Sequence, residues 1–263
     1  MSILSSNTLS KSDFYTGAFP AEFGNALSGA FDIKLRNGNN EKREYAFQAS
    51  VLGLEAALEG PFKKGSRASY LVNYRYSTLG LFTKLGINIV DEDEVTTYQD
   101  ASFKVNIPTE KAGTFSFYGI GGLSSDDWQP SGGFEKYETK SDVGVAGMNH
   151  LWRLNDKSYL KSFVAYSGTR ITEDYTENDA EYQYESTQKK AKTYLRVGTK
   201  LRTKLSPRHI LETGLTYSRL AYDFNEKEEI IFGSTPPQMN ETFNQKGNSG
   251  TFQAYGSWKY RIS

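Results

Sequence analysis

Alternation of apolar and polar residues runs through most of this chain and limits what it can fold into. Successive side chains of a β-strand point to opposite faces, so a period of two indicates strands with one apolar and one polar face. In residues 191–205, Leu195, Val197, Leu201 and Leu205 alternate with lysines and arginines. Similar alternation, less regular in places, is found in residues 43–51, 54–61, 67–76, 97–107, 113–123, 142–154, 158–171, 208–222 and 251–262. We therefore predict an all-β chain of about ten strands.

The connections between these predicted strands alternate between short and long. Short turns are expected at residues 63–65, 108–112, 155–157 and 206–207. Long polar segments, which we expect to be loops, fall at residues 78–96, 124–140, 172–189 and 224–249. Barrels of the bacterial outer membrane have tight turns at one end and long loops at the other. The order of connections therefore favours a partial transmembrane antiparallel β-barrel.

A soluble β-sandwich is the alternative, because alternation alone does not say whether the apolar face meets a protein core or lipid. Three features favour lipid. Several stretches run ten or more residues, against about five or six in ordinary strands; the opposite face is rich in Lys, Arg and Glu; and the connection lengths alternate by side. Trp152, Tyr159, Trp258 and Tyr260 near strand ends fit an interfacial girdle, and equally fit edge packing.

Composition excludes several classes of protein. The 31 basic residues balance 31 acidic residues, and nucleic-acid binding needs a concentrated positive field. No run approaches the roughly 18 apolar residues of a membrane helix. The chain has no cysteine, which removes disulfide and thiolate chemistry. The first residues lack a basic stretch followed by an apolar core, so no signal peptide is visible; if the chain belongs to a membrane barrel, we expect the true N-terminus to lie upstream.

Residues 1–40 differ from the rest, being rich in Gly and Ser around one dense motif, YTGAFPAEFGNALSGAFDIK, at residues 15–34. The motif resembles the end of the plug domain of TonB-dependent outer-membrane receptors, where a Gly-rich Pro-Ala-Glu-Phe-Gly turn leads into the last plug strand. Residues 58–61 and 73–77 resemble the opening barrel strands of a receptor subgroup that includes many glycan and siderophore importers. The positions that carry the motif are Gly17, Pro20, Glu22, Phe23, Gly24, Asn25 and Gly29.

The resemblance implies that residues 1–40 are the C-terminal part of a plug domain and residues 41–263 the N-terminal portion of a barrel of about twenty-two strands. It implies an outer-membrane location, contact with outer-membrane lipid, and energy-coupled import of a nutrient such as a siderophore or a glycan. It also implies coupling to the TonB complex through a box that is absent from this fragment. The ligand is expected to be a small molecule or an oligosaccharide.

Two alternatives from other classes remain open. One is a passive outer-membrane barrel or an adhesin without a moving plug; in that case residues 14–36 form an external arm instead of lying inside a lumen. The other is a soluble β-sandwich that binds carbohydrate through exposed aromatic side chains.

No catalytic constellation is found in the sequence, and we expect neither an enzyme nor a cofactor. His150 and His209 lie in or beside different predicted strands without partners at metal-ligand spacing. Acidic clusters at residues 91–94, 126–127 and 173–174 could coordinate calcium, since hard cations take clustered carboxylates, but a solvated loop surface is the commoner role of such clusters. We therefore predict no metal site.

Four basic side chains are expected on the polar, lumen-facing side of the predicted barrel. They are Arg67, Arg75, Lys200 and Arg202. Such residues either line a substrate path or hold the plug through ion pairs, and the second role is the one we favour.

Overall fold

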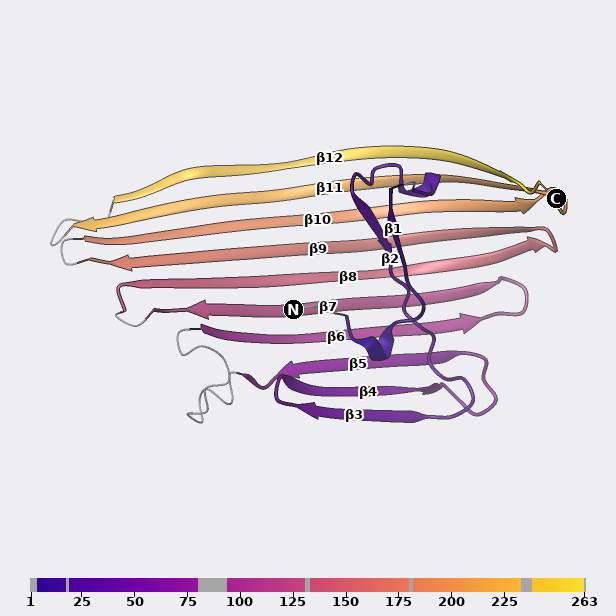
Figure 1. Cartoon of the computed structure of the whole chain (residues 1–263), viewed down its shortest axis with the longest axis horizontal. Coiled ribbons are helices and arrows are strands. Elements are labelled where there is room, and N and C mark those ends of the chain that lie inside the picture. The colour runs from indigo at the N-terminus through magenta and orange to yellow at the C-terminus, as the bar shows by residue number, and fades with distance from the viewer. Residues whose placement is uncertain are drawn as a thin grey trace.

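The computed structural model describes residues 4–17, 19–79, 94–130, 133–179, 182–232 and 238–262. Ten strands form one large antiparallel sheet, and two short strands form a second sheet (Figure 1). The ten strands are β3 (Glu44–Ser50), β4 (Gly53–Pro61), β5 (Ser69–Ser77), β6 (Glu94–Pro108), β7 (Thr114–Trp128), β8 (Glu135–Asn155), β9 (Ser158–Asn178), β10 (Tyr182–Lys204), β11 (His209–Phe232) and β12 (Gln238–Tyr260).

The ten strands follow one another across the large sheet in chain order. Each strand pairs with its neighbours in the sequence, so β3 lies at one edge and β12 at the other, and the sheet is not closed into a barrel. The all-β, antiparallel prediction is confirmed, and all ten predicted strands are present. Among the described residues, no helix combines the length and the apolar character that crossing a membrane would require.

The short turns lie where the sequence predicted them, whereas the prediction of long loops was wrong for most of the described residues in those segments. β9 continues to Asn178 and β10 begins at Tyr182, so residues 172–189 are mostly strand. The same holds for residues 124–140 and 224–249, which belong mainly to β7, β8, β11 and β12. Polar side chains occupy both faces there, so the alternation that marks a strand is lost, although the backbone pairing continues. Residues 80–93 lie outside the described residues.

Register divides the side chains of the large sheet between two faces. Phe103, Gly119, Ala146, Tyr166 and Leu195 lie opposite one another across β6 to β10, and we call their side the outer face. The next row, on the inner face, consists of Lys104, Tyr118, Gly147, Ala165 and Arg196. Apolar and polar residues are therefore sorted to opposite sides of one sheet.

The apolar residues of the outer face form a band that covers only part of each long strand. On β10 the band runs from Leu195 to Leu201, and the outer-face positions before it include Lys189 and Glu185. β10 has 23 residues, of which about half flank the band with polar groups on both faces. The band and this polar extension are two distinct parts of the same sheet.

The described residues contain almost no apolar core. The buried hydrophobic side chains among them are Leu71 and Leu79, whereas Phe252 and Trp258 are 69% and 66% exposed. Asn73 and Asp100, on the inner face, are among the buried residues. The second sheet consists of β1 (Asp13–Thr16) and β2 (Gly29–Asp32) alone, so no second large sheet packs on the apolar face as a soluble sandwich requires.

Two turn glycines give a test of this packing. Gly113 and Gly65 both have left-handed φ angles, 80° and 77°. A Cβ atom at Gly113 would lie 2.3 Å from the carbonyl oxygen of Leu151, whereas none of the surrounding atoms lies within 4 Å of one at Gly65. We expect Gly65→Ala to lower the free energy of unfolding by about 1 kcal/mol, from backbone strain, and Gly113→Ala to lower it by clearly more. Equal losses in a denaturant titration would contradict the close approach at Gly113.

Candidate functional site

Residues 4–17 and 19–40, which we call the N-terminal segment, cross the large sheet on its inner face (Figure 1). Within the segment, β1 pairs with β2, and Phe14 stacks on Phe31 with ring centroids 4.1 Å apart. The connection between them contains a short 3₁₀ turn, η2 (Ala21–Phe23). The motif found in the sequence is therefore a loop presented toward the sheet by a two-stranded hairpin.

The first contact between motif and sheet is an ion pair. Lys200 Nζ on β10 lies 2.8 Å from Glu22 Oε2 in η2 and 2.8 Å from Glu212 Oε1 on β11. Arg202 Nε is 3.8 Å from the other oxygen of Glu212. One ammonium group is thus shared between a carboxylate of the N-terminal segment and a carboxylate of the sheet.

The second contact involves Arg36, which follows β2. Its guanidinium binds both oxygens of Glu59 on β4, at 2.7 and 2.6 Å, and its Nε donates to the carbonyl oxygen of Asn7 at 2.6 Å. The backbone N–H of Asn39 also donates to Glu59, at 2.7 Å. Hydrogen bonding to Glu59 raises the pKa of Arg36, and the two-pronged geometry makes this pair stronger than a single ion contact.

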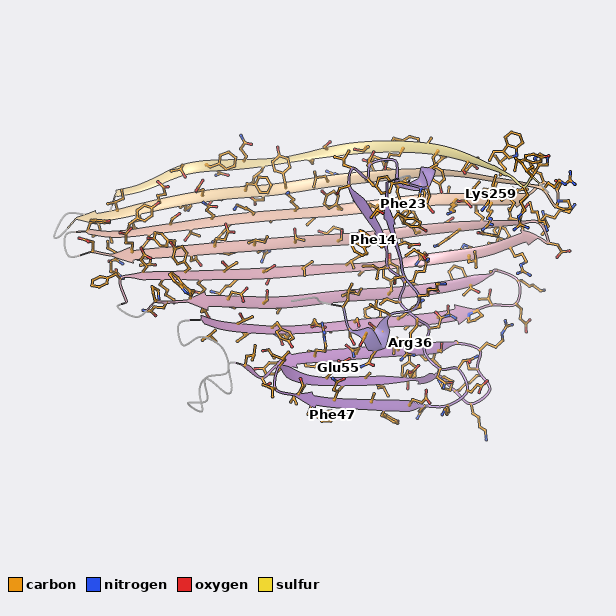
Figure 2. The ribbon with its side chains drawn as sticks, in the orientation of Figure 1. Phe14, Phe23, Arg36, Phe47, Glu55 and Lys259 are labelled. Carbon is orange, nitrogen blue, oxygen red and sulfur yellow. The ribbon has the colours of Figure 1, made fainter. Side chains whose placement is uncertain are left out.

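The third contact lies at the start of the segment, next to η1 (Ser6–Thr8). Glu55 Oε1 on β4 accepts hydrogen bonds from Ser5, Asn7 and Asn73, at 2.5, 2.7 and 2.7 Å. Asn73 is fully buried. Figure 2 shows Arg36 and Glu55 together near the first strands of the sheet, and Phe23 near the last strands. The segment is therefore attached at both sides of the sheet.

A cavity of about 740 Å³ separates the motif from the sheet between these contacts. Glu22, Phe23 and Asn25 line it on the motif side. On the sheet side it is lined by several residues of β7 to β12, among them the cations Lys161, Arg196 and Lys200. The wall of the cavity mixes polar and apolar groups, and it carries more positive charge than negative charge.

Within the N-terminal segment itself, Lys34 joins the two strands of the hairpin. Its ammonium group lies 2.8 Å from Asp32 and 2.9 Å from Asp13. Hydrogen bonds to Asp32 and then Asp13 raise the pKa of Lys34. The hairpin is therefore held by its own ion pairs, independently of the sheet.

The predicted motif residues have different roles. Gly17 has a φ of 86°, which favours glycine. Pro20 precedes η2, and Gly24 follows η2.

The side chains of the motif make several contacts. The ring of Phe23 packs against Tyr15, with ring centroids 5.5 Å apart. A Cβ atom at Gly29 would lie 3.0 Å from the ring of Phe14. Glu22 binds the sheet and Asn25 lines the cavity, so most of the motif shapes the loop and a minority makes contacts.

Three of the four predicted lumen-facing cations lie on the inner face. Arg75 pairs with Asp100 at 2.9 Å, and Lys200 and Arg202 join the Glu212 cluster. Arg67 is exposed in the connection before β5, because that strand begins only at Ser69. Of the four, Lys200 contacts the motif, through Glu22.

The residues of the sheet that bind the N-terminal segment were not predicted from the sequence. Glu55 and Glu59 alternate with Leu54 and Leu58, so their place on the polar face was readable from the sequence. That Arg36 would bind Glu59 was not readable, since it depends on how the segment crosses the sheet.

The residues considered for metal binding are separate in the structure. His150 Nε2 lies 2.6 Å from the carbonyl oxygen of Ala112, and His209 accepts a hydrogen bond from Trp258 at 3.1 Å. Glu173 pairs with Lys190. In the described ranges no group of three or more His, Asp or Glu side chains is placed to hold a metal ion. Residues 91–93 lie outside those ranges.

Comparison with known proteins gives no family assignment: no family model matches the chain, and no curated protein matches it. The functional argument therefore depends on the geometry described above.

The Glu22–Lys200 pair predicts how the motif responds to substitution. Lys200→Met removes the partner of Glu22, and partly exposed ion pairs contribute up to about 1 kcal/mol. We therefore expect amide hydrogen exchange in residues 19–29 to rise by up to about fivefold, with little change in β7 to β9. Glu173→Gln, which breaks a pair of equal length far from the motif, is the matched control. Unchanged exchange in the Lys200→Met variant would show that the pair does not hold the motif.

Proposed function

We propose that this chain belongs to a TonB-dependent outer-membrane transporter, in which the large sheet is part of the barrel wall and the N-terminal segment is the end of the plug. One observation carries the proposal: the sheet is apolar outside along a band that covers part of each long strand, and its polar inner face binds the motif that resembles a plug.

The outer band fits a lipid bilayer. A tilted transmembrane strand needs about 9–11 residues to cross the hydrocarbon layer. On β10 the band from Leu195 to Leu201 spans seven residues, slightly fewer than this, while the strands themselves reach 24 residues. At the end of the band near the short turns, His209 stacks against Trp258 and Tyr260, at 5.4 and 4.8 Å, as interfacial aromatic residues do. The polar extension at the other end suits water.

The inner contacts fit a plug that can be displaced. The segment is held by ion pairs and hydrogen bonds, which water can replace, and Phe14 and Phe31 stay exposed instead of packing on the sheet. Under the proposal, ligand binds at the ends of the long strands, TonB pulls the plug with energy from the inner membrane, and a path opens through the cavity beside η2. The transported nutrient is a small molecule or an oligosaccharide.

The contacts of Glu22 and Arg36 with the inner face favour this proposal over a passive barrel or an adhesin, in which residues 14–36 would extend away from the sheet. The exposed apolar face argues against a soluble carbohydrate-binding module, because in water that face would have no cover.

Depth-dependent substitutions test the membrane placement. Val164 and Thr176 both lie on the outer face of β9, one inside the band and one in the polar extension. We expect Val164→Arg to destabilise the chain folded in lipid vesicles by about 2–4 kcal/mol and Thr176→Arg by about 0–1 kcal/mol. Equal effects of the two variants in a urea titration would remove the membrane placement.

The source gene tests the transporter assignment itself. We expect the reading frame to encode a TonB box and most of a plug domain before residue 1, and further barrel strands after residue 263. A signal peptide directly before residue 1 and a stop codon directly after residue 263 would leave a small plugless barrel in its place.

A further inference from the structure

Four aromatic side chains form a continuous row across four neighbouring strands of the polar extension. They are Trp128 on β7, Tyr137 on β8, Tyr175 on β9 and Tyr184 on β10. Successive ring centroids are 5.2, 4.5 and 5.9 Å apart. We call this set the aromatic row. Three strand spacings of about 4.8 Å give it a length of about 14 Å.

The aromatic row lies on the inner face, beyond the N-terminal segment. Trp128 has the same strand parity as Tyr118, which lines the cavity under the motif, and no register shift separates the two. Trp128 and Tyr137 are 38% and 43% exposed. The row therefore presents ring surface to solvent instead of being enclosed by neighbouring side chains.

Carboxylates surround the aromatic row. Glu177 accepts hydrogen bonds from the hydroxyl groups of Tyr175 and Tyr182, at 3.2 and 2.7 Å. The other acidic residues on this part of the inner face are Asp126, Glu135, Glu173, Glu226 and Glu228. Among the described residues of this part, Lys190 and Lys192 supply positive charge; Glu173 already pairs with Lys190 at 2.8 Å, and the ammonium group of Lys192 lies over the ring of Phe224. The local field is therefore strongly negative.

We propose that the aromatic row binds an elongated organic cation that carries ammonium groups, of the polyamine class. Ring faces attract cations through their quadrupole, and the surrounding carboxylates add to that attraction. The length of the row suits a ligand with several charges spaced along a chain. An anionic ligand is disfavoured here, in contrast to the cavity under the motif. Only one part of this assignment rests on the proposed function, namely that this end of the sheet faces the outside of the cell.

Cross-strand stabilisation is the competing explanation, since facing aromatic pairs stabilise antiparallel strands without any ligand. That explanation requires neither the exposed ring surface nor the carboxylates. It also predicts that substitutions in the row change stability alone, whereas the binding site predicts a change in affinity for cations.

The test is spermidine binding to the whole 263-residue chain in detergent micelles. In a background with Trp152→Phe and Trp258→Phe, Trp128 is the remaining tryptophan, and we expect spermidine to quench its fluorescence saturably. Triacetylated spermidine, which has the same chain without the charges, is expected not to bind. Absence of saturable binding by spermidine, or equal binding of the acetylated form, would overturn the assignment.

Two pairs of variants separate the row from a general acidic surface. We expect Tyr137→Leu and Glu177→Gln each to weaken spermidine binding about three- to tenfold. Tyr194→Leu, elsewhere on the inner face, and Glu138→Gln, on the outer face of β8 beside Tyr137, are the matched controls and should bind normally. If Glu138→Gln weakens binding as much as Glu177→Gln does, the row is not the site. Far-UV circular dichroism verifies that each variant is folded.

The outcome is independent of the transporter proposal. Loss of spermidine binding with the expected difference between Val164→Arg and Thr176→Arg would remove the ligand assignment and leave the membrane placement. If spermidine still binds and the two arginine variants have equal effects, the ligand assignment stands and the membrane placement is removed.

Discussion

Antiparallel pairing between sequence neighbours fixes the side of the sheet on which each residue lies, and every other feature depends on it. A slip of one residue would move a strand's whole apolar set to the inner face. The register shifts that occur lie near strand ends, at Arg153/Asn155 and Glu226/Lys227. The parity of the strands is therefore preserved wherever the N-terminal segment contacts them, and Glu55, Glu59 and Lys200 all face it.

This sorting produces a molecule whose polarity is reversed relative to a soluble protein. Stability in water normally comes from burying apolar surface, at about 25 cal/mol per Å², but only Leu71 and Leu79 among the described residues are buried hydrophobic side chains. Pairing satisfies most backbone hydrogen bonds of the described sheet, except along the outer edges of β3 and β12 and where a strand extends past a shorter neighbour, as residues 94–98 of β6 do beside β5. Under the proposed function, lipid at the outer face supplies what a core would otherwise supply, and this is the physical basis of the proposed membrane placement.

The sequence predicted strands wherever one face was apolar and missed them where both faces were polar. Residues 191–205 were recognised because leucine and valine alternate with lysine and arginine, whereas residues 182–190 of the same strand carry polar groups on both sides. The motif was found through its glycines and its resemblance to a plug. Its contact with Lys200 was not predictable, because Glu22 lies 178 residues away and meets it only through the register of the sheet.

The side chains of the sheet that bind the N-terminal segment differ in whether they keep another hydrogen-bond or ion-pair partner when the segment is displaced. Lys200 keeps Glu212 at 2.8 Å, and Glu55 keeps Asn73 at 2.7 Å, so neither group is left as an uncompensated buried charge, the outcome that makes breaking a pair costly. The described hydrogen bonds of Glu59, in contrast, all come from the segment, through Arg36 and Asn39.

Breaking the contact between Glu22 and Lys200 therefore costs less free energy than breaking the contact between Arg36 and Glu59. The two contacts also lie at different distances along the chain from the start of the sheet. Arg36 lies eight residues before β3 begins at Glu44, so the strong contact is also the one closest to the covalent connection with the sheet. Under the proposed function, the segment is held at its sheet-proximal end by the Arg36–Glu59 pair while the η2 loop detaches from Lys200. The order of strengths thus permits the loop beside the cavity to move without removing the segment from the sheet.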